Sequence, residues 1–158
     1  MGSSENDNGV TEFYSLDDIR SWDKVGLPDE SLDGKLFDGG CVAVTVDGSV
    51  CNAFYQTKQF TCSHSVTVLY IPNMFMTELV GLFIASVIMK DKYRWSYGRK
   101  PHSIEKFGKS FLSLPILYDT SGHPVIDPLK KYSDDGYIPD WTFMEQYIES
   151  LPGSDLLK

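Results

Sequence analysis

The sequence predicts a mixed α/β (α+β) fold, with a mostly antiparallel, hairpin-built twisted sheet packed with one long apolar helix and several short helices. Residues 41–46 form a β-branched run with alternating faces, and a second apolar run at 50–55 follows the turn pair Asp47-Gly48, which indicates a hairpin. Residues 65–71 are apolar on both faces, as in a covered central strand. Residues 79–89 are apolar at helical spacing.

The composition predicts a single folded domain. The chain has 158 residues, of which 42% are hydrophobic and 23% charged, as in ordinary globular proteins. Residues 1–12 are polar and are predicted to form a leader or disordered arm, and residues 13–158 to form the domain. The longest apolar run, residues 79–89, is shorter than the roughly 20 residues of a membrane span, so no membrane association is expected.

The remaining elements follow from local signals. Residues 15–22 are predicted to form a short helix capped by Ser15, and residues 26–40 to form a loop. The apolar helix should begin at Asn73 or Thr77 and end near Tyr93, because Gly98 and a proline follow.

The C-terminal third is predicted to contain a strand, a turn-rich segment and a helix. Residues 103–109 suit one more helical turn, residues 111–117 a strand, and residues 119–124 and 127–140 turns. A last helix at 141–151 should be capped by Asp140. Its core-facing residues are predicted to be Trp141, Met144, Tyr147 and Ile148.

The motifs of common catalytic and metal sites are missing from the sequence. It contains no phosphate-binding glycine loop, dinucleotide fingerprint, serine-hydrolase elbow or zinc-protease helix. Cys41, Cys51 and Cys62 lack the spacing of a zinc site, and reduced cysteines packed in the core of a cytoplasmic protein are expected. These observations favour a binding role without catalysis and without a cofactor.

A basic, aromatic stretch interrupts an acidic chain. The net charge is −8, yet residues 91–110 contain six Lys or Arg against two carboxylates, with Tyr93, Trp95 and Tyr97 interspersed. Basic groups neutralise phosphates, arginine can also bind guanine at two points, and aromatic rings pack on sugars or bases. A solvated surface loop, with cations favoured by the helix dipole, is the alternative explanation.

The order of the motifs resembles the target recognition domain of type I restriction–modification specificity subunits and of related fused type II enzymes. The motifs are the hairpin series GGCVAVTVDGSVCNAFYQTKQFTCSHSVTVLYI, the apolar helix, KYRWSYGRK, FLSLPI and GYIPDWTFMEQYI. The resemblance covers about residues 36–150. It implies a non-catalytic module that reads double-stranded DNA, while methyltransferase and endonuclease subunits or fused domains perform the chemistry.

The resemblance also implies which residues contact DNA. The loop after the apolar helix is the first choice, the hairpin turn with the following strand and loop is the second, and the segment before the third strand is the third. The first group is Arg94, Tyr97, Arg99, Lys100, His102, Ser103 and Lys106; the second is Ser49, Tyr55, Gln56 and Lys58; the third is Ser63 and His64.

Two features of the sequence keep other functions open. Such subunits normally carry two recognition domains joined by long coiled-coil helices, and this chain shows no heptad pattern. Three alternatives stay open: a fragment of a longer subunit, a half-subunit completed by a second copy (a homodimer) or a second recognition domain, and a divergent relative that no longer binds DNA. The acidic ends also suit a protein-interaction module or a DNA mimic of the same fold. A small-molecule enzyme using a pocket beside the apolar helix is the third alternative.

Overall fold

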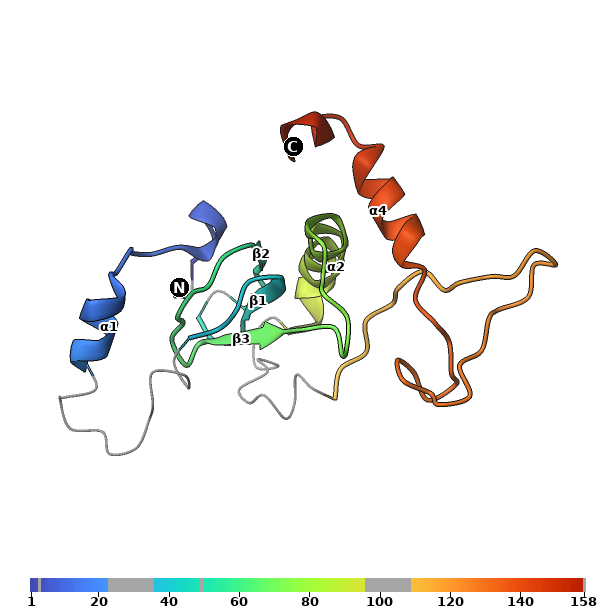
Figure 1. Ribbon diagram of the computed structural model, residues 1–158, viewed down its shortest axis with the longest axis horizontal. Helices are drawn as coiled ribbons and strands as arrows, with labels where there is room; N and C mark the ends of the chain where they lie inside the picture. Colours follow the sequence, from blue (N-terminus) through green and yellow to red (C-terminus); the bar gives the residue numbers. More distant parts are fainter. Residues whose placement is uncertain (3, 23–35, 49, 96–108, 158) are drawn as a thin grey trace.

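The computed structural model describes residues 1–2, 4–22, 36–48, 50–95 and 109–157, with Arg20 described for its backbone alone. Within them, a three-stranded sheet, the helix α2 (Glu78–Lys90) and the helix α4 (Trp141–Glu149) are stacked side by side (Figure 1). Helix α2 packs against the sheet on one side and against α4 on the other. The predicted mixed α/β class with an antiparallel sheet is confirmed.

The strand β1 (Cys41–Thr45) is the centre of the sheet. It pairs antiparallel with β2 (Ala53–Gln56) on one side and with β3 (Val66–Leu69) on the other. All five residues of β1 are buried, whereas Val68 and Leu69 of β3 are only partly buried. The prediction that residues 65–71 form the central strand is therefore wrong, because β1 lies between β2 and β3 in the sheet.

The predicted β1–β2 hairpin is confirmed, with a longer connection than a two-residue turn. Thr45 and Asn52 are joined by a backbone hydrogen bond of 2.9 Å, and the Cys51 N–H donates to the Thr45 carbonyl at 2.7 Å. The chain reverses direction there with positive φ angles at Gly48 (70°) and Cys51 (59°). A left-handed non-glycine residue such as Cys51 is uncommon, and its side chain is fully buried.

Helix α2 begins where its cap predicts. The Thr77 hydroxyl accepts from the Val80 N–H, and the α-helix ends at Lys90, earlier than the predicted end near Tyr93. The chain continues as the 3₁₀ turn η3 (Asp91–Trp95). The helix face toward the sheet contains Gly81, where an added Cβ would overlap the ring of Tyr55. Glycine therefore lets α2 approach β2 closely.

Helix α4 is held against α2 by buried side chains and by a polar contact. Met144 and Ile148 are buried, and Glu145 Oε1 accepts from the Thr77 hydroxyl at 2.7 Å. The predicted cap is confirmed, since Asp140 Oδ1 accepts from the Phe143 N–H at 2.9 Å. Tyr147, which was expected in the core, is 47% exposed.

Residues 116–139 form an arm that returns to its starting point. Isolated antiparallel bridges join Ile116 to Pro139, Tyr118 to Pro124 and Ile126 to Tyr137. The predicted strand at 111–117 is wrong: residue 116 makes one bridge, and residues 111–113 are exposed without extended pairing in the part that the structure describes. Pro115 contributes to this, because it has no N–H to donate to a ladder.

The N-terminal residues lie along the edge strand β2. The amino group of Met1 donates to the Thr61 carbonyl at 2.6 Å, and the Asn8 side chain donates to the Tyr55 carbonyl at 3.2 Å. The predicted helix follows as α1 (Leu16–Trp22), with the Ser15 hydroxyl accepting from the Asp18 N–H at 3.1 Å. The division into residues 1–12 and a domain at 13–158 stays a prediction.

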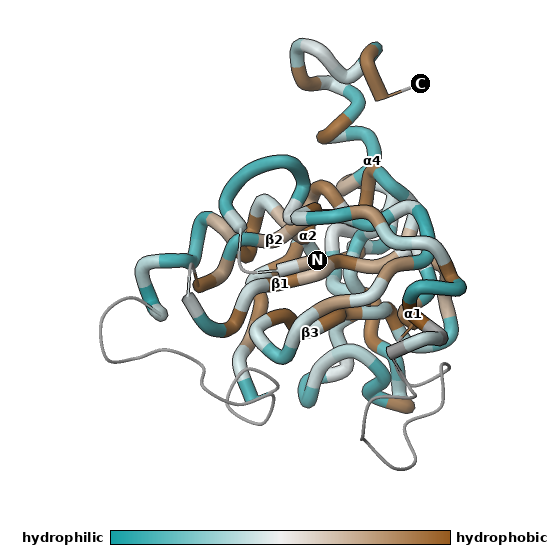
Figure 2. The backbone as a smooth tube through the Cα atoms, turned by 90° about the vertical axis from the view of Figure 1, so that its left-hand side faces the viewer, coloured by the Kyte–Doolittle hydropathy of each residue, from teal (hydrophilic) through white to brown (hydrophobic). Residues whose placement is uncertain are grey.

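The hydrophobic core lies where the sheet, α2 and α4 meet. Hydrophobic stretches of the backbone trace concentrate in this region, and more hydrophilic ones surround it (Figure 2). None of the described helices has the length and apolarity needed to cross a bilayer. The largest fully buried side chains are Met76, Met144, Val42, Val44, Val80, Cys41 and Cys51.

Candidate nucleic-acid interface

Most of the first predicted contact group falls outside the described residues, as does one residue of the second group. The residues concerned are Tyr97, Arg99, Lys100, His102, Ser103, Lys106 and Ser49. Their assignment to DNA stays a prediction.

The end of β1 gathers three of the segments that the sequence singles out. The Thr45 N–H donates to the Asn52 carbonyl at 2.9 Å, and the Val46 N–H donates to the Ser65 carbonyl at 2.8 Å. The hairpin turn and the segment containing Ser63 and His64 therefore lie at the same end of the sheet. The turn η3 also reaches this end, because Lys92 Nζ donates to Asn52 Oδ1 at 2.9 Å.

Ser63 and His64 are exposed, as a DNA contact requires. They occupy the turn that precedes β3, and the Ser63 N–H donates to the Met1 carbonyl at 3.0 Å. Their side chains remain accessible to a ligand approaching this end of the sheet. Their predicted role is compatible with their location.

Arg94 lies on the surface but is already paired. Its Nη1 contacts Asp91 Oδ2 at 2.9 Å and the Phe111 carbonyl at 3.5 Å, and 43% of the side chain is exposed. Exposed ion pairs contribute only about 0–1 kcal/mol. A phosphate can therefore replace Asp91 at small expense in free energy, so the pairing does not remove Arg94 from the candidate interface.

Lys92 links η3 to the hairpin connection, and 43% of its side chain remains exposed. Its ammonium group contacts Asn52 Oδ1 and, at 3.4 Å, Glu5 Oε1. Lys92 therefore connects η3 with the residue that precedes β2 and with the N-terminal segment. Asn52 is a polar residue in a buried position. A buried polar side chain needs a hydrogen-bond partner, and Lys92 supplies one here.

We expect Lys92→Met to lower the free energy of unfolding by about 1 kcal/mol. A hydrogen bond to a charged group contributes about 1.5–3 kcal/mol, and partial exposure of the lysine reduces this. Urea unfolding of this variant and of Lys90→Met, which removes an exposed cation at the end of α2, measures the difference. Equal losses in the two variants would show that the Asn52 contact does not matter.

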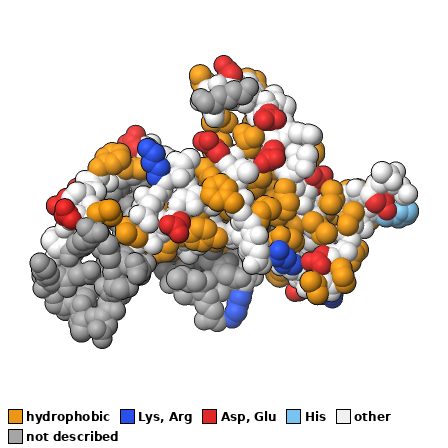
Figure 3. All heavy atoms as spheres, in the orientation of Figure 1, with side chains coloured by type: hydrophobic (Ala, Val, Ile, Leu, Met, Phe, Trp, Pro, Cys, Tyr) orange, Lys and Arg blue, Asp and Glu red, His pale blue; other side chains and the backbone are white. Residues whose placement is uncertain are grey.

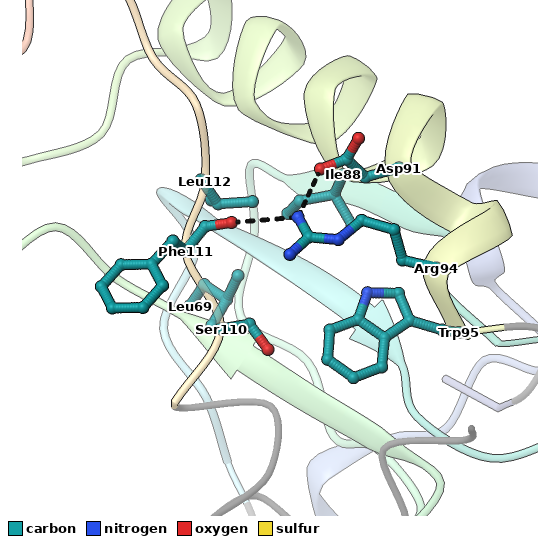
Figure 4. A pocket seen from close by; sticks show the side chains of 8 residues that line it. All are labelled: Leu69, Ile88, Asp91, Arg94, Trp95, Ser110, Phe111 and Leu112. Carbon is teal, nitrogen blue, oxygen red and sulfur yellow. Dashed lines mark hydrogen bonds and ion pairs between the residues drawn. The ribbon is translucent and has the colours of Figure 1, made fainter.

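A small cavity lies beside Arg94, between β3, the end of α2 and the segment at 110–112 (Figure 4). Figure 4 shows the Arg94 side chain reaching from η3 toward the Phe111 carbonyl, with the Trp95 indole beside it. The volume is about 180 Å³, below the roughly 300–1,000 Å³ of typical ligand pockets. The lining residues are Leu69, Ile88, Asp91, Arg94, Trp95, Ser110, Phe111 and Leu112.

Two residues of the second predicted group belong to the core. Tyr55 is buried, and its hydroxyl donates to the Met76 carbonyl at 2.9 Å. Gln56 is also buried, and its amide donates to the Asn8 carbonyl at 3.2 Å. Neither side chain can reach DNA while these bonds persist. Lys58 is exposed, but it follows Gln56, which pairs with Cys41 at the opposite end of β1.

The two buried cysteines are not activated nucleophiles. Burial raises the pKa of the Cys41 and Cys51 thiols to about 11, so both are protonated at neutral pH and are poor nucleophiles. No group of three His, Cys, Asp or Glu side chains suited to a metal ion occurs among the described residues. What this end of the sheet offers is exposed polar and cationic groups.

Comparison with known proteins supports the resemblance seen in the sequence. The chain is similar to the specificity subunit S.BcgI of a type II restriction enzyme from Heyndrickxia coagulans, with 26% identity over 148 residues. The alignment covers 94% of this chain and 33% of the relative, so this chain spans about a third of that protein's length. No family model and no solved structure matches the chain. The predicted resemblance to specificity subunits is confirmed.

Proposed function

We propose that this chain is a sequence-specific double-stranded DNA recognition module of a restriction–modification system. The observation that carries the proposal is the similarity to a restriction-enzyme specificity subunit along 94% of the chain. The motifs that carry the resemblance are spread over nearly the whole folded chain. The match to the specificity subunit therefore extends over the whole module, which a role common to both proteins explains better than one short common motif does.

The proposed DNA face is the end of the sheet reached by the turn before β3 and by η3. His64 and Ser63 are exposed there, while Arg94 is held on the surface by a weak ion pair beside Leu69, toward the other end of β3. The chain passes from η3 into the basic segment that includes Arg99 and Lys100. Such a segment can neutralise phosphates, while polar side chains at the sheet end reach base edges.

The catalytic steps are assigned to other polypeptides or domains. In this proposal, methyltransferase and endonuclease subunits or fused domains act at the sequence that this module reads, in the cytoplasm. The module itself binds no cofactor and is not an enzyme. A second recognition domain or a second copy of this chain completes the bipartite reading of DNA.

The proposal predicts salt-dependent binding that involves the basic segment. For B-form DNA, the logarithm of affinity falls with the logarithm of salt concentration with a slope of about −0.9 for each neutralised phosphate. We expect Arg99→Ala/Lys100→Ala to reduce the magnitude of this slope by about 1–2. Fluorescence anisotropy of a labelled duplex between low and moderate salt measures it.

The matched control is Lys130→Ala/Lys131→Ala, which removes the same charge from the arm. This control should leave the slope unchanged, because the arm lies away from the proposed face. Equal slopes for the wild-type chain and the Arg99/Lys100 variant would place the contact elsewhere. An absence of duplex binding even at low salt would overturn the proposal itself.

A further inference from the structure

Helix α4 carries an exposed apolar stripe beside its buried face. Phe143 and Tyr147 are four residues apart on one side of the helix, and Leu151 follows just beyond the helix end, after the C-cap Ser150. Their exposed fractions are 47%, 47% and 41%. Met144 and Ile148, on the neighbouring side, are buried against the core. The apolar surface thus extends beyond what packing on α2 requires.

The stripe is preorganised by contacts between its aromatic rings. Phe143 and Tyr147 are stacked with centroids 6.2 Å apart, and Tyr147 meets Phe83 of α2 edge-on at 5.6 Å. We call Phe83, Phe143, Tyr147 and Leu151 the α4 stripe. Rings that are already ordered lose little side-chain entropy on binding, and aromatic residues are enriched among the strongest contacts of protein interfaces.

The charged residues that neighbour α4 in the sequence are almost all acidic. Residues 133–157 contain six carboxylates and no Lys or Arg. Glu145 and Glu149 lie on α4 itself. Figure 3 shows hydrophobic side chains gathered over α4 and the adjoining arm, with acidic side chains around the upper part of α4. Such a surface repels DNA phosphates and suits a partner with basic groups around an apolar centre.

We infer that the α4 stripe is the docking surface for the catalytic polypeptide of the proposed restriction–modification assembly. The fitting element is a helix whose apolar side chains lie between lysines or arginines, which would pack its apolar side on Phe143 and Tyr147. The inference rests on the proposed function for the identity of the partner. A second copy of this chain fits less well, because it would bring Glu145 and Glu149 toward their own like charges.

The test uses the full chain and the methyltransferase polypeptide of the proposed assembly. Calorimetry measures their affinity for the wild type, for Tyr147→Lys/Leu151→Lys and for the control Leu129→Lys, which changes an 85%-exposed leucine of the arm. The double variant should bind at least about tenfold more weakly, as truncating a central aromatic contact does. The control should bind like the wild type.

The variant Glu149→Lys and a duplex DNA ligand distinguish loss of partner binding from loss of folding or of DNA binding. Glu149→Lys adds no bulk to the core and should weaken the partner's binding in a salt-dependent way. Circular dichroism establishes that each variant is folded, and duplex DNA binding should be unchanged in all of them. Loss of partner affinity together with retained DNA binding supports the docking surface.

Three results would overturn the inference. Partner affinity that is equal in the wild type and in the folded Tyr147→Lys/Leu151→Lys variant places the interface elsewhere. A wild-type chain that dimerises in light scattering, and a variant that does not, assigns the stripe to a second copy. A chain that binds duplex DNA but never the methyltransferase excludes the docking surface and leaves the DNA proposal standing, whereas failure to bind DNA rejects the proposed function.

Discussion

Met144→Ala is expected to lower the free energy of unfolding by about 2–5 kcal/mol, the range for removing a large buried aliphatic or thioether side chain. Met144 is fully buried and belongs to the core cluster that joins α4 to α2. The loss has two parts, the transfer of the side chain from the core and the cavity that the surrounding residues fail to fill. Urea unfolding followed by circular dichroism measures both together.

The matched control is Met89→Ala, which makes the same chemical change at a residue of α2 that is 40% exposed. Its effect should stay within about 0.5–1 kcal/mol, since exposed substitutions away from special features change stability little. A Met144→Ala variant no less stable than the control would show that α4 contributes little to the cooperative core. In that case α4 should also be among the first segments to exchange its amide hydrogens.

Gly81→Ala is expected to destabilise the protein by about 1–3 kcal/mol even though alanine is the better helix former. In an ordinary helix position this change stabilises by about 0.5–1 kcal/mol. Here the new methyl group would overlap the Tyr55 ring, and the hydroxyl of that ring is fixed to the Met76 carbonyl at 2.9 Å. Either α2 moves away from the sheet or Tyr55 leaves its rotamer, and both lose packing.

Thermal unfolding of Gly81→Ala, Ser86→Ala and Tyr55→Val tests this cause. Ser86 is exposed on the same helix, and its hydroxyl donates to the Leu82 carbonyl at 2.8 Å. Ser86→Ala therefore reports the helix preference together with the loss of one exposed hydrogen bond, and should be close to neutral. Tyr55→Val makes room for the methyl group, so the double variant with Gly81→Ala should lose less stability than the sum of the two single variants. Strict additivity would mean that the ring does not limit the approach of α2.

The helices were predictable because the signals that begin them are local. Thr77 and Asp140 accept hydrogen bonds from the third residue after them, as a capping residue does, and both helices begin directly afterwards. The last residue of α2 was harder to predict, because the 3₁₀ turn η3 begins directly after the α-helix ends. The basic residues there fit an α-helix and a 3₁₀ turn equally well.

The order of the strands was not predictable from the periodicity of single segments. The segment at 65–71 is apolar on both faces, yet Tyr70 is 48% exposed and its hydroxyl donates to the Asp38 carbonyl at 2.9 Å. The central position of β1 depends on which strands pair with it, a long-range property. Periodicity reports how much of a strand can be buried and says nothing about its neighbours.

The DNA contacts stay predictions, and the structure shows only how accessible the described candidates are. The exposed positions of Ser63, His64 and Lys58 agree with a surface role, whereas Tyr55 and Gln56 are core residues. In the sequence, Tyr55 and Gln56 stand close to Lys58, a combination typical of an exposed binding loop. Their actual partners, Met76 and Asn8, are remote along the chain, so local patterns could not reveal them.

The arm at 116–139 has a consequence for how this scaffold can change. Its two ends are adjacent, because the Asp140 N–H donates to the Pro115 carbonyl at 2.9 Å. Near its tip, a side chain added at Gly122 would meet no described atom within 4 Å. Extra residues inserted at that tip would lengthen the arm without moving its two ends, because the entropic cost of closing a surface loop grows slowly with its length. Descendants of one ancestor can thus diverge there in size while inheriting an unaltered framework.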